Sequence, residues 1–229
     1  MDLSLRSAQG EAMDDPNLDE KVYQRCLGDL ARVNRVTLTH RTTINWLAHK
    51  IHALPRSVRV SVLDIGCGQG DLLRIIAAWA RREERSVSLI GLDLNPRSAT
   101  AARAVGGDED ITYLTEDVFA FQPEVKLDFI VTSQFTHHLA DAEIVRLLGW
   151  MDEHSRLGWH ITDLHRHWFA YYGYPLLARL LGWHPIVRAD GQISIARGFS
   201  RREWEMLLTQ AGLHARIKWQ PLFRYTVST

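Results

Sequence analysis

The sequence predicts an α/β domain built on a mostly parallel β-sheet, with a helical cap and a terminal antiparallel hairpin. Three observations point to this fold class. Five strand-like apolar runs alternate with helical patterns between residues 60 and 162, as in repeated β-α units with right-handed crossovers. A glycine-rich turn follows the first of these runs. Two alternating runs, over 215–219 and 223–227, close the chain around Pro221 and are typical of a β-hairpin.

The composition is that of one globular domain with its own core. The chain has 229 residues, of which 46% are hydrophobic and 24% are charged. Its 27 basic and 27 acidic side chains cancel, so we expect no nucleic-acid partner. Since no apolar run approaches the roughly twenty residues that span a bilayer and no signal-peptide pattern is present, we expect a cytoplasmic protein. Cys26 and Cys67 provide neither a disulfide framework nor a metal cluster.

The residues before the sheet predict a tail and two helices. Residues 1–18 are polar and acidic without apolar periodicity, so we expect a mobile tail that carries no chemistry. Apolar side chains then recur at three- and four-residue intervals, which predicts two amphipathic helices as an N-terminal helical cap over 19–56. Residues 21–60 carry eight Lys or Arg side chains against the single acid Asp29. This asymmetry fits a solvated helix face, an anionic substrate, an acidic carrier protein or a membrane surface.

The glycine-rich turn carries the strongest functional signal. It joins a β-branched strand pattern to a helical pattern over 71–80, and it reads Asp64-x-Gly66-x-Gly68-x-Gly70. Glycines let the backbone approach a ligand closely, and the N–H groups at a helix start face polar ligand atoms. A dinucleotide fingerprint needs glycine where Asp71 stands, and a P-loop needs a Gly-Lys-Ser/Thr sequence that does not follow. The turn therefore predicts a cradle for a different nucleotide-like cofactor.

The second strand pattern ends in an acidic residue, Asp93. It lies about twenty positions beyond the last glycine, where a strand-end carboxylate binds two ribose hydroxyls. Asn95 and Pro96 mark the start of the next helix, and Gly106 with Gly107 marks its end. We therefore place Asp93 in the cofactor site.

Two more strand patterns, over 111–114 and 127–132, lead to a pair of histidines. The fourth pattern is almost entirely apolar, as expected where helices cover both faces of a sheet. His137 and His138 follow it, at the edge where open α/β sheets bind ligands. Histidine has the one side chain whose unperturbed pKa suits proton transfer near neutral pH. The pair is therefore the candidate for general base.

A fifth strand pattern over 157–162 is followed by a break in the β-α rhythm. The stretch 164–199 is rich in aromatic residues, and we interpret it as an inserted cap. Within it, Asp190-Gly191 stands between two apolar runs and predicts a two-residue hairpin. Ser200 then starts a helix with a capping box, and Gly212 ends that helix.

In this order the motifs resemble those of class I S-adenosylmethionine (SAM)-dependent methyltransferases, over about residues 58–229. The resemblance implies a Rossmann-like fold with a seven-stranded sheet whose last strand is reversed, and SAM bound over the ends of the first three strands. The chain lacks the Asn/Asp-Pro-Pro-aromatic motif that a DNA or protein-amide N-methyltransferase would show after the fourth strand. The implied cofactor site consists of Asp64, Gly66, Gly68, Gly70, Asp93, Leu94, Asp117, Val118 and Gln134. In it, Asp117 and the Val118 backbone would meet the adenine.

Two later blocks are similar to bacterial small-molecule methyltransferases found beside type III polyketide synthases: Asp163-Leu164-x-Arg166 and Arg188-x-Asp190-Gly191-x-x-Ser194-x-x-Arg197-x-Phe199. This similarity implies O-methylation of a phenol, a pyrone or a long-chain polyketide in secondary metabolism. We expect a monomer or homodimer. C- or N-methylation of a small molecule stays open, as does SAM binding without methyl transfer, because a fold does not choose the acceptor atom.

Methyl transfer sets the remaining expectations. The reaction is an in-line displacement from which water is excluded, and a phenol or enol oxygen must lose its proton. We choose His138 as the general base and His137 as its neighbour in orientation or substrate binding. For the acceptor pocket we expect Trp168, Tyr171, Tyr172 and Arg188.

The cofactor carboxylate also needs a cation. We expect Arg41 from the second N-terminal helix, with Arg35 as the second choice. His165 and His167 have no acid or cysteine at ligand spacing, so we expect no metal site.

Overall fold

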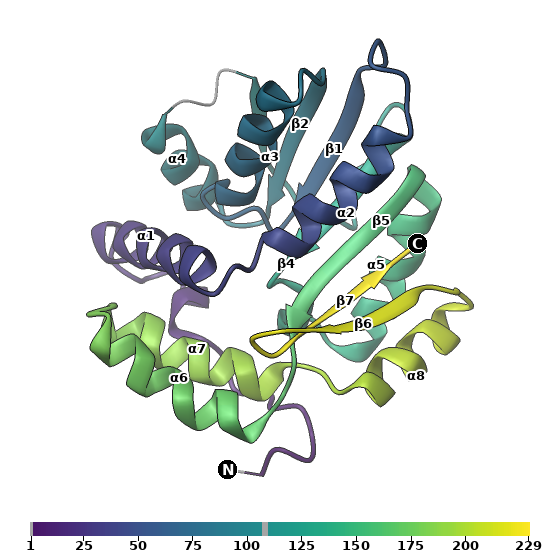
Figure 1. The fold of residues 1–229 in the computed structure, drawn as a ribbon. Helices are drawn as coiled ribbons and strands as arrows, with labels where there is room; N and C mark the ends of the chain where they lie inside the picture. Colours follow the sequence, from purple (N-terminus) through teal and green to yellow (C-terminus); the bar gives the residue numbers. More distant parts are fainter. Residues whose placement is uncertain (1, 107–109) are drawn as a thin grey trace.

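A computed structural model describes residues 2–106 and 110–229 (Figure 1). Gly107, which we expected to help end a helix, lies outside these residues. The strands are β1 (Val60–Ile65), β2 (Val87–Asp93), β3 (Ile111–Thr115), β4 (Leu127–Ser133), β5 (Ser155–Leu164), β6 (Arg216–Gln220) and β7 (Arg224–Ser228). The α-helices are α1 (Glu20–Val36), α2 (Arg41–His52), α3 (Asp71–Arg82), α4 (Pro96–Val105), α5 (Asp141–His154), α6 (Trp168–Leu180), α7 (Pro185–Arg197) and α8 (Arg201–Ala211). Two short 3-10 helices are η1 (Ala12–Asp14) and η2 (Thr136–His138).

The strands form one seven-stranded sheet in the order β3-β2-β1-β4-β5-β7-β6. The pairs among β1 to β5 are parallel, whereas β7 runs antiparallel to both β5 and β6. The predicted fold class is confirmed, including the reversed last strand and the terminal hairpin. β2 and β3 follow β1 on one side of the sheet, and β4 and β5 lie on its other side. The order of strands therefore reverses beside the glycine-rich turn, and ligands bind in crevices at such switch points.

Helices cover both faces of the sheet, and alternate strand residues divide between two cores. On one face, Val62 packs with Leu47 of α2 and with apolar residues of α3 and α4. On the other face, Leu63 packs with α5 and α8, where Trp204 is fully buried. No helix in the described part of the chain is long and apolar enough to span a membrane.

A third cluster joins the cap to the N-terminal segment. α6 and α7 lie beyond the carboxyl ends of the strands, and α1 packs against α7 (Figure 1). Tyr23 and Cys26 of α1 are buried with Trp183 and Val187 of the α6–α7 region, and Met13 of η1 belongs to the same cluster. α1 therefore caps the site, while α2 joins the helical layer on the sheet.

The expectation of a mobile tail over residues 1–18 is corrected for residues 2–18. The N–H groups of Ala12 and Met13 donate to the two carboxylate oxygens of Asp190, both at 2.9 Å. The buried Arg166 guanidinium donates to the carbonyls of Leu3 and Ser4. A polar composition therefore did not mean disorder here, because these polar groups pair with buried charges of the cap.

The hairpin expected at Asp190-Gly191 is also wrong, since α7 runs through it. His184 caps this helix with its side chain and Pro185 occupies the first turn, both of which favour a helix start. Gly191 makes room for an aromatic ring, because a Cβ there would lie 2.3 Å from Cε1 of Tyr174. The Asp-Gly pair thus serves packing between elements and not a turn.

Candidate active site

A cavity of about 510 Å³ lies between the glycine-rich turn, α1 and the cap helices. The cavity wall contains six of the residues predicted for the site: Asp64, Gly66, Gly68, Gln134, His137 and His138. The fold thus brings the turn after β1 and the segment after β4 into one pocket.

The turn after β1 is held by the acid that ends β2. The Gly68 N–H donates to Asp93 Oδ2 at 2.8 Å and the Asn95 N–H to Oδ1 at 2.9 Å. Burial raises the pKa of Asp93, while these two hydrogen bonds favour its ionised form. Gly70 has a left-handed φ of 76° and packs against Tyr113, whose hydroxyl would lie 2.3 Å from an added Cβ. Gly70 therefore shapes the turn and does not line the cavity.

Carboxylates gather around this turn. Asp64 is 2% exposed, and burial, followed by the charges of Asp71 and Asp93, raises its pKa well above the ordinary value. Asp71 Oδ2 is hydrogen-bonded to His40 Nε2 at 2.8 Å and accepts from Asn34 at 3.0 Å. Burial alone would raise the pKa of Asp71, but the hydrogen bond and charge of His40 lower it. This end of the cavity suits a positively charged group.

Three polar atoms in the cavity wall have no hydrogen-bond partner among the described residues: His40 Nδ1, Ser133 Oγ and Arg224 Nε. Burial lowers the pKa of Arg224 to about 10, so the side chain remains charged at neutral pH. Arg41, the cation expected from the sequence, is exposed and lies outside the wall, as does Arg35. Buried polar groups without partners are uncommon in proteins, so these three wall residues are candidates for contact with a bound ligand.

The residues expected around the adenine lie outside the cavity wall. Asp117 is exposed and its carboxylate accepts from the Phe119 N–H. Val118 is buried in the main core, and Leu94 is 71% exposed. Asp117 and Val118 thus begin a turn beside the sheet edge, where local hydrogen bonding and core packing account for them.

The aromatic lining also differs from the expected set. Trp168 and Tyr172 of α6 are 62% and 57% exposed, and neither they nor Tyr171 and Arg188 line the cavity. The ring residues that do line it are Phe169, Tyr174 and Phe223. The difference follows from helix geometry, because neighbouring residues on a helix point about 100° apart and the sequence did not reveal which face of α6 turns inward.

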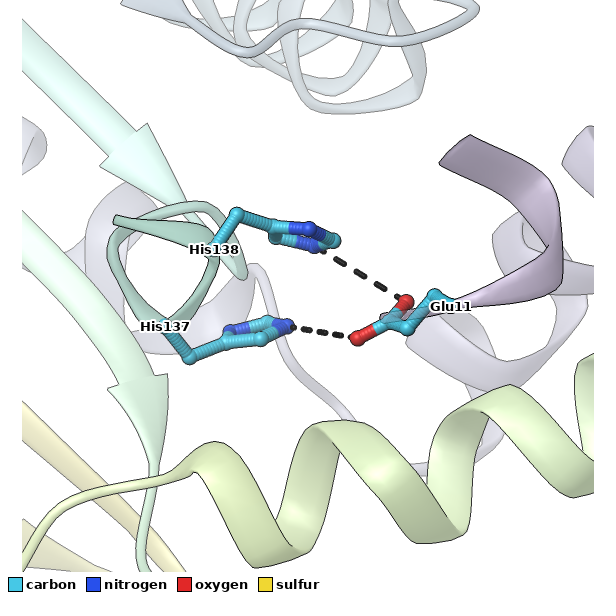
Figure 2. Close-up of side chains that lie close together, drawn as sticks. All are labelled: Glu11, His137 and His138. Carbon is cyan, nitrogen blue, oxygen red and sulfur yellow. Dashed lines mark ion pairs between the residues drawn. The ribbon is translucent and has the colours of Figure 1, made fainter. Parts of the chain in front are cut away.

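The two histidines of η2 point toward a carboxylate that the sequence did not suggest (Figure 2). His137 Nε2 lies 3.6 Å from Glu11 Oε1, and His138 Nε2 lies 3.9 Å from Glu11 Oε2. The Glu11 side chain is only 8% exposed, and Ser194 Oγ donates to it at 2.7 Å. Glu11 lies in the polar segment that we expected to be a tail, and no motif around it indicates a functional role.

Each imidazole also has a carboxylate at its other nitrogen. His137 Nδ1 lies 2.7 Å from Asp163 Oδ1, and His138 Nδ1 lies 3.5 Å from Asp14 Oδ2. Burial alone would lower the pKa of His137, but the charge and hydrogen bond of Asp163, and then Glu11, raise it to about 9. His137 is therefore protonated at neutral pH in the free protein and does not serve there as a base.

The cap residues singled out in the sequence hold this arrangement together. Arg197 Nε and Nη2 donate to the carbonyls of His137 and His138, both at 2.9 Å. Ser194 and Asp190 bind the N-terminal segment through Glu11 and the backbone around Met13. Leu139, which follows His138, packs on the main core. The later sequence blocks thus connect the cap, η1 and η2.

Comparison with known proteins supports the fold. A family described as a methyltransferase domain matches residues 62–158, a range that runs from β1 into β5 and includes the glycine-rich turn, Asp93 and η2. The fold is that of a class I methyltransferase. No curated protein matched the sequence.

Solved methyltransferases share the fold at low sequence identity. Plantazolicin methyltransferase BpumL, in complex with a monoazolic desmethylPZN analog and SAH, is 14% identical with a TM-score of 0.66, over 88% of this chain and 87% of that chain. Human N-acetylserotonin methyltransferase with SAM is 18% identical with a TM-score of 0.61, over 92% and 56%. Magnesium protoporphyrin IX methyltransferase from Synechocystis with SAH is 14% identical with a TM-score of 0.57, over 94% and 90%.

Proposed function

We propose that this protein is a SAM-dependent methyltransferase that transfers the methyl group to an oxygen of a small acceptor. The observation that carries the proposal is the continuity of one cavity, which reaches from the glycine-rich turn to the histidines of η2. A cofactor and an acceptor can therefore meet in one space that the cap helices shield from water, as methyl transfer requires.

The cofactor end of the cavity fits SAM in shape and charge. The turn after β1 offers close backbone approach. Asp93 lies outside the cavity wall but binds the Gly68 N–H of this turn, and we propose it as the ribose ligand because it ends β2. Asp64 and Asp71 suit the positive sulfonium and ammonium groups. Arg224, and not Arg41, is our candidate for the carboxylate, since it lies in the wall with an unpartnered Nε. When bound, SAM supplies the methyl group.

The acceptor end is apolar with a polar cluster on one side. Phe169, Tyr174 and Phe223 supply ring surface that suits an apolar or aromatic acceptor. His138, 28% exposed on its side chain, is our candidate for the group that takes the acceptor's proton, because His137 already carries a proton between Asp163 and Glu11. His137 would then orient the cluster.

The acceptor class follows from this lining and from the resemblance of the cap blocks. We propose a phenol, pyrone or long-chain polyketide, methylated by a monomer or homodimer; a cytoplasmic location remains a prediction. C- or N-methylation is the alternative, because the fold does not select the atom. Binding of SAM without methyl transfer is the second alternative, in a protein that regulates or assembles with a partner.

Turnover distinguishes these alternatives. The purified protein should convert SAM to S-adenosylhomocysteine (SAH) only when a phenolic or pyrone acceptor is added, and mass spectrometry of the product should place the methyl group on oxygen. Tight SAM binding by calorimetry without SAH formation over a panel of phenols, pyrones, amines and carbon acids would favour the binding protein. Methylated carbon or nitrogen would replace the O-methyl proposal.

A further inference from the structure

The cluster of Glu11, His137 and His138 has the composition of a metal site. One ligand atom from each residue can be chosen such that all three atoms lie within 4.8 Å of one another, and all three residues line the cavity. We propose that these residues bind a divalent transition-metal ion, with Zn²⁺ as the best match, and that the open coordination position of the ion faces the cavity.

The carboxylates behind the histidines support this inference. Asp163 binds Nδ1 of His137 at 2.7 Å, and Asp14 lies 3.5 Å from Nδ1 of His138. In metal sites, a ligating histidine almost always binds a carboxylate, carbonyl or water through its second nitrogen, which fixes the tautomer and the ring orientation. Here His137 has that partner at hydrogen-bond distance and His138 has a carboxylate at ion-pair distance. Both Nε2 atoms face Glu11 (Figure 2).

The separations are close to those of a coordinated ion. Ligand atoms that bind a tetrahedral Zn²⁺ at its usual bond lengths stand about 3.4 Å apart. The two contacts between Glu11 and the imidazoles, at 3.6 and 3.9 Å, involve different carboxylate oxygens, and ligand atoms taken one from each residue lie within 4.8 Å of one another. Metal binding would therefore draw these atoms together by up to about 1.4 Å. Glu11 and the histidines stand on the short elements η1 and η2 or beside them, so a small adjustment does not disturb a long helix or the sheet.

The donor set selects the type of metal. Two imidazole nitrogens and one carboxylate with an open position match catalytic zinc sites and ferrous sites. Mg²⁺ and Ca²⁺ prefer oxygen ligands throughout, and the cluster offers only one carboxylate in direct reach. We therefore expect Zn²⁺ and Co²⁺ to bind and Mg²⁺ to compete poorly.

One consequence rests on the proposed function. An acceptor hydroxyl that coordinates the ion would lose its proton more readily, because a bound divalent ion lowers the pKa of its oxygen ligands. The proton would leave to solvent on the side of Asp14, whose side chain is 53% exposed. The histidines would then act as ligands, and His138 would not need to act as the base.

Metal binding can be tested apart from catalysis. Protein without an affinity tag, stripped with EDTA and dialysed, is titrated with Zn²⁺ against a chromogenic chelator and with Co²⁺ in the visible spectrum. We expect one equivalent of each metal to bind. Glu11→Gln and His138→Gln should each weaken Zn²⁺ binding about a hundredfold or more, whereas Asp14→Asn should weaken it about ten- to a hundredfold.

A surface pair of histidines provides the matched control. His49 and His52 are exposed on α2, with His52 3.6 Å from Glu83, so this pair represents adventitious binding. The double variant His49→Gln, His52→Gln should retain the one tight equivalent. Circular dichroism should show that Glu11→Gln and His138→Gln remain folded; if one of them unfolds, the other decides.

The inference is overturned if no equivalent binds at micromolar Zn²⁺, or if Glu11→Gln and His138→Gln bind as tightly as the wild type. Its failure is separable from that of the proposed function. SAH formation that continues in EDTA, together with the absence of tight binding, rejects the metal site and leaves the methyltransferase. Tight binding that depends on Glu11, without SAH formation from any acceptor, retains the metal site and rejects the methyltransferase.

Discussion

The two ends of the cavity are built in different ways. At the cofactor end, the hydrogen bond that holds the turn joins Gly68 to Asp93, 25 residues apart, within one β-α-β unit. At the acceptor end, the hydrogen bonds join more distant segments, since Ser194 binds Glu11 over 183 residues and Arg197 binds His137 over 60. Contacts between distant segments form only after the intervening chain has folded, whereas the turn needs only the pairing of its two neighbouring strands.

The largest effect should come from deletion of residues 2–18, which join the cap to the acceptor end. The deletion removes Glu11 and both backbone donors to the buried Asp190. Arg166 loses its bonds to Leu3 and Ser4 and keeps those to Gly198 and Glu203. An uncompensated buried charge costs about 3 to 5 kcal/mol, so we expect a large loss of stability in denaturant titration and no turnover. An unchanged unfolding midpoint would show that the segment does not hold the cap.

The next largest effect should come from the histidines. His138→Gln should lower the turnover number about a hundred- to ten-thousand-fold, whether His138 acts as base or as metal ligand, while SAM still binds at the distant end of the cavity. Calorimetry and SAH assays measure the two effects separately. A variant that loses SAM affinity as much as turnover would contradict the division of the cavity into two ends.

The cofactor end is tested by Asp93. Asp93→Ala removes a carboxylate that holds the turn and that we place on the ribose, and hydrogen bonds to charged groups contribute about 1.5 to 3 kcal/mol each. We expect SAM affinity to fall at least about tenfold in calorimetric titration. Arg41→Ala is the control, because its exposed side chain lies outside the wall, and its affinity should remain that of the wild type.

The pair His137–Asp163 predicts how stability depends on pH in the metal-free protein. The pKa of His137 is raised from 6.5 to about 9, so its contribution is complete below pH 6.5 and is lost as the pH rises through 9. Burial alone would raise the pKa of Asp163, but the charge of His137 lowers it from 3.8, so that contribution is lost in acid. The melting temperature of wild type should therefore exceed that of His137→Gln most at pH 4–6.5, and the difference should shrink above pH 9. A difference that stays constant to pH 10 would reject the protonated state.

The smallest expected effect separates two neighbours on α6. Phe169 is 57% exposed and lines the cavity, whereas Trp168 beside it is 62% exposed and lies outside the wall. Phe169→Ala should raise the acceptor's KM about fivefold, corresponding to about 1 kcal/mol of lost apolar contact, with unchanged SAM affinity. Trp168→Ala should change neither the acceptor's KM nor the SAM affinity. A larger rise in KM for Trp168→Ala than for Phe169→Ala would instead place Trp168 in the acceptor pocket, as the sequence predicted.

The sheet and the glycine-rich turn with its Asp93 partner could be predicted from the sequence alone. Strand patterns, the alternating glycines and Asp93 are local signals, since period-2 apolar runs and the φ angles of turns depend on a few neighbouring residues. The same holds for the capping box at Ser200 and for the terminal hairpin around Pro221, both of which the structure confirms.

The residues that form the acceptor end could be identified only from the tertiary structure. Glu11 stands in a polar stretch without periodicity, Asp190-Gly191 has the signature of a turn, and Trp168 and Phe169 are equivalent in a linear reading. Their roles came from contacts with residues far away in the chain, as in the hydrogen bonds from the N-terminal segment to Asp190 and the close approach of Tyr174 to Gly191. Such contacts form when the chain closes, and the energy of packing then outweighs the local preference.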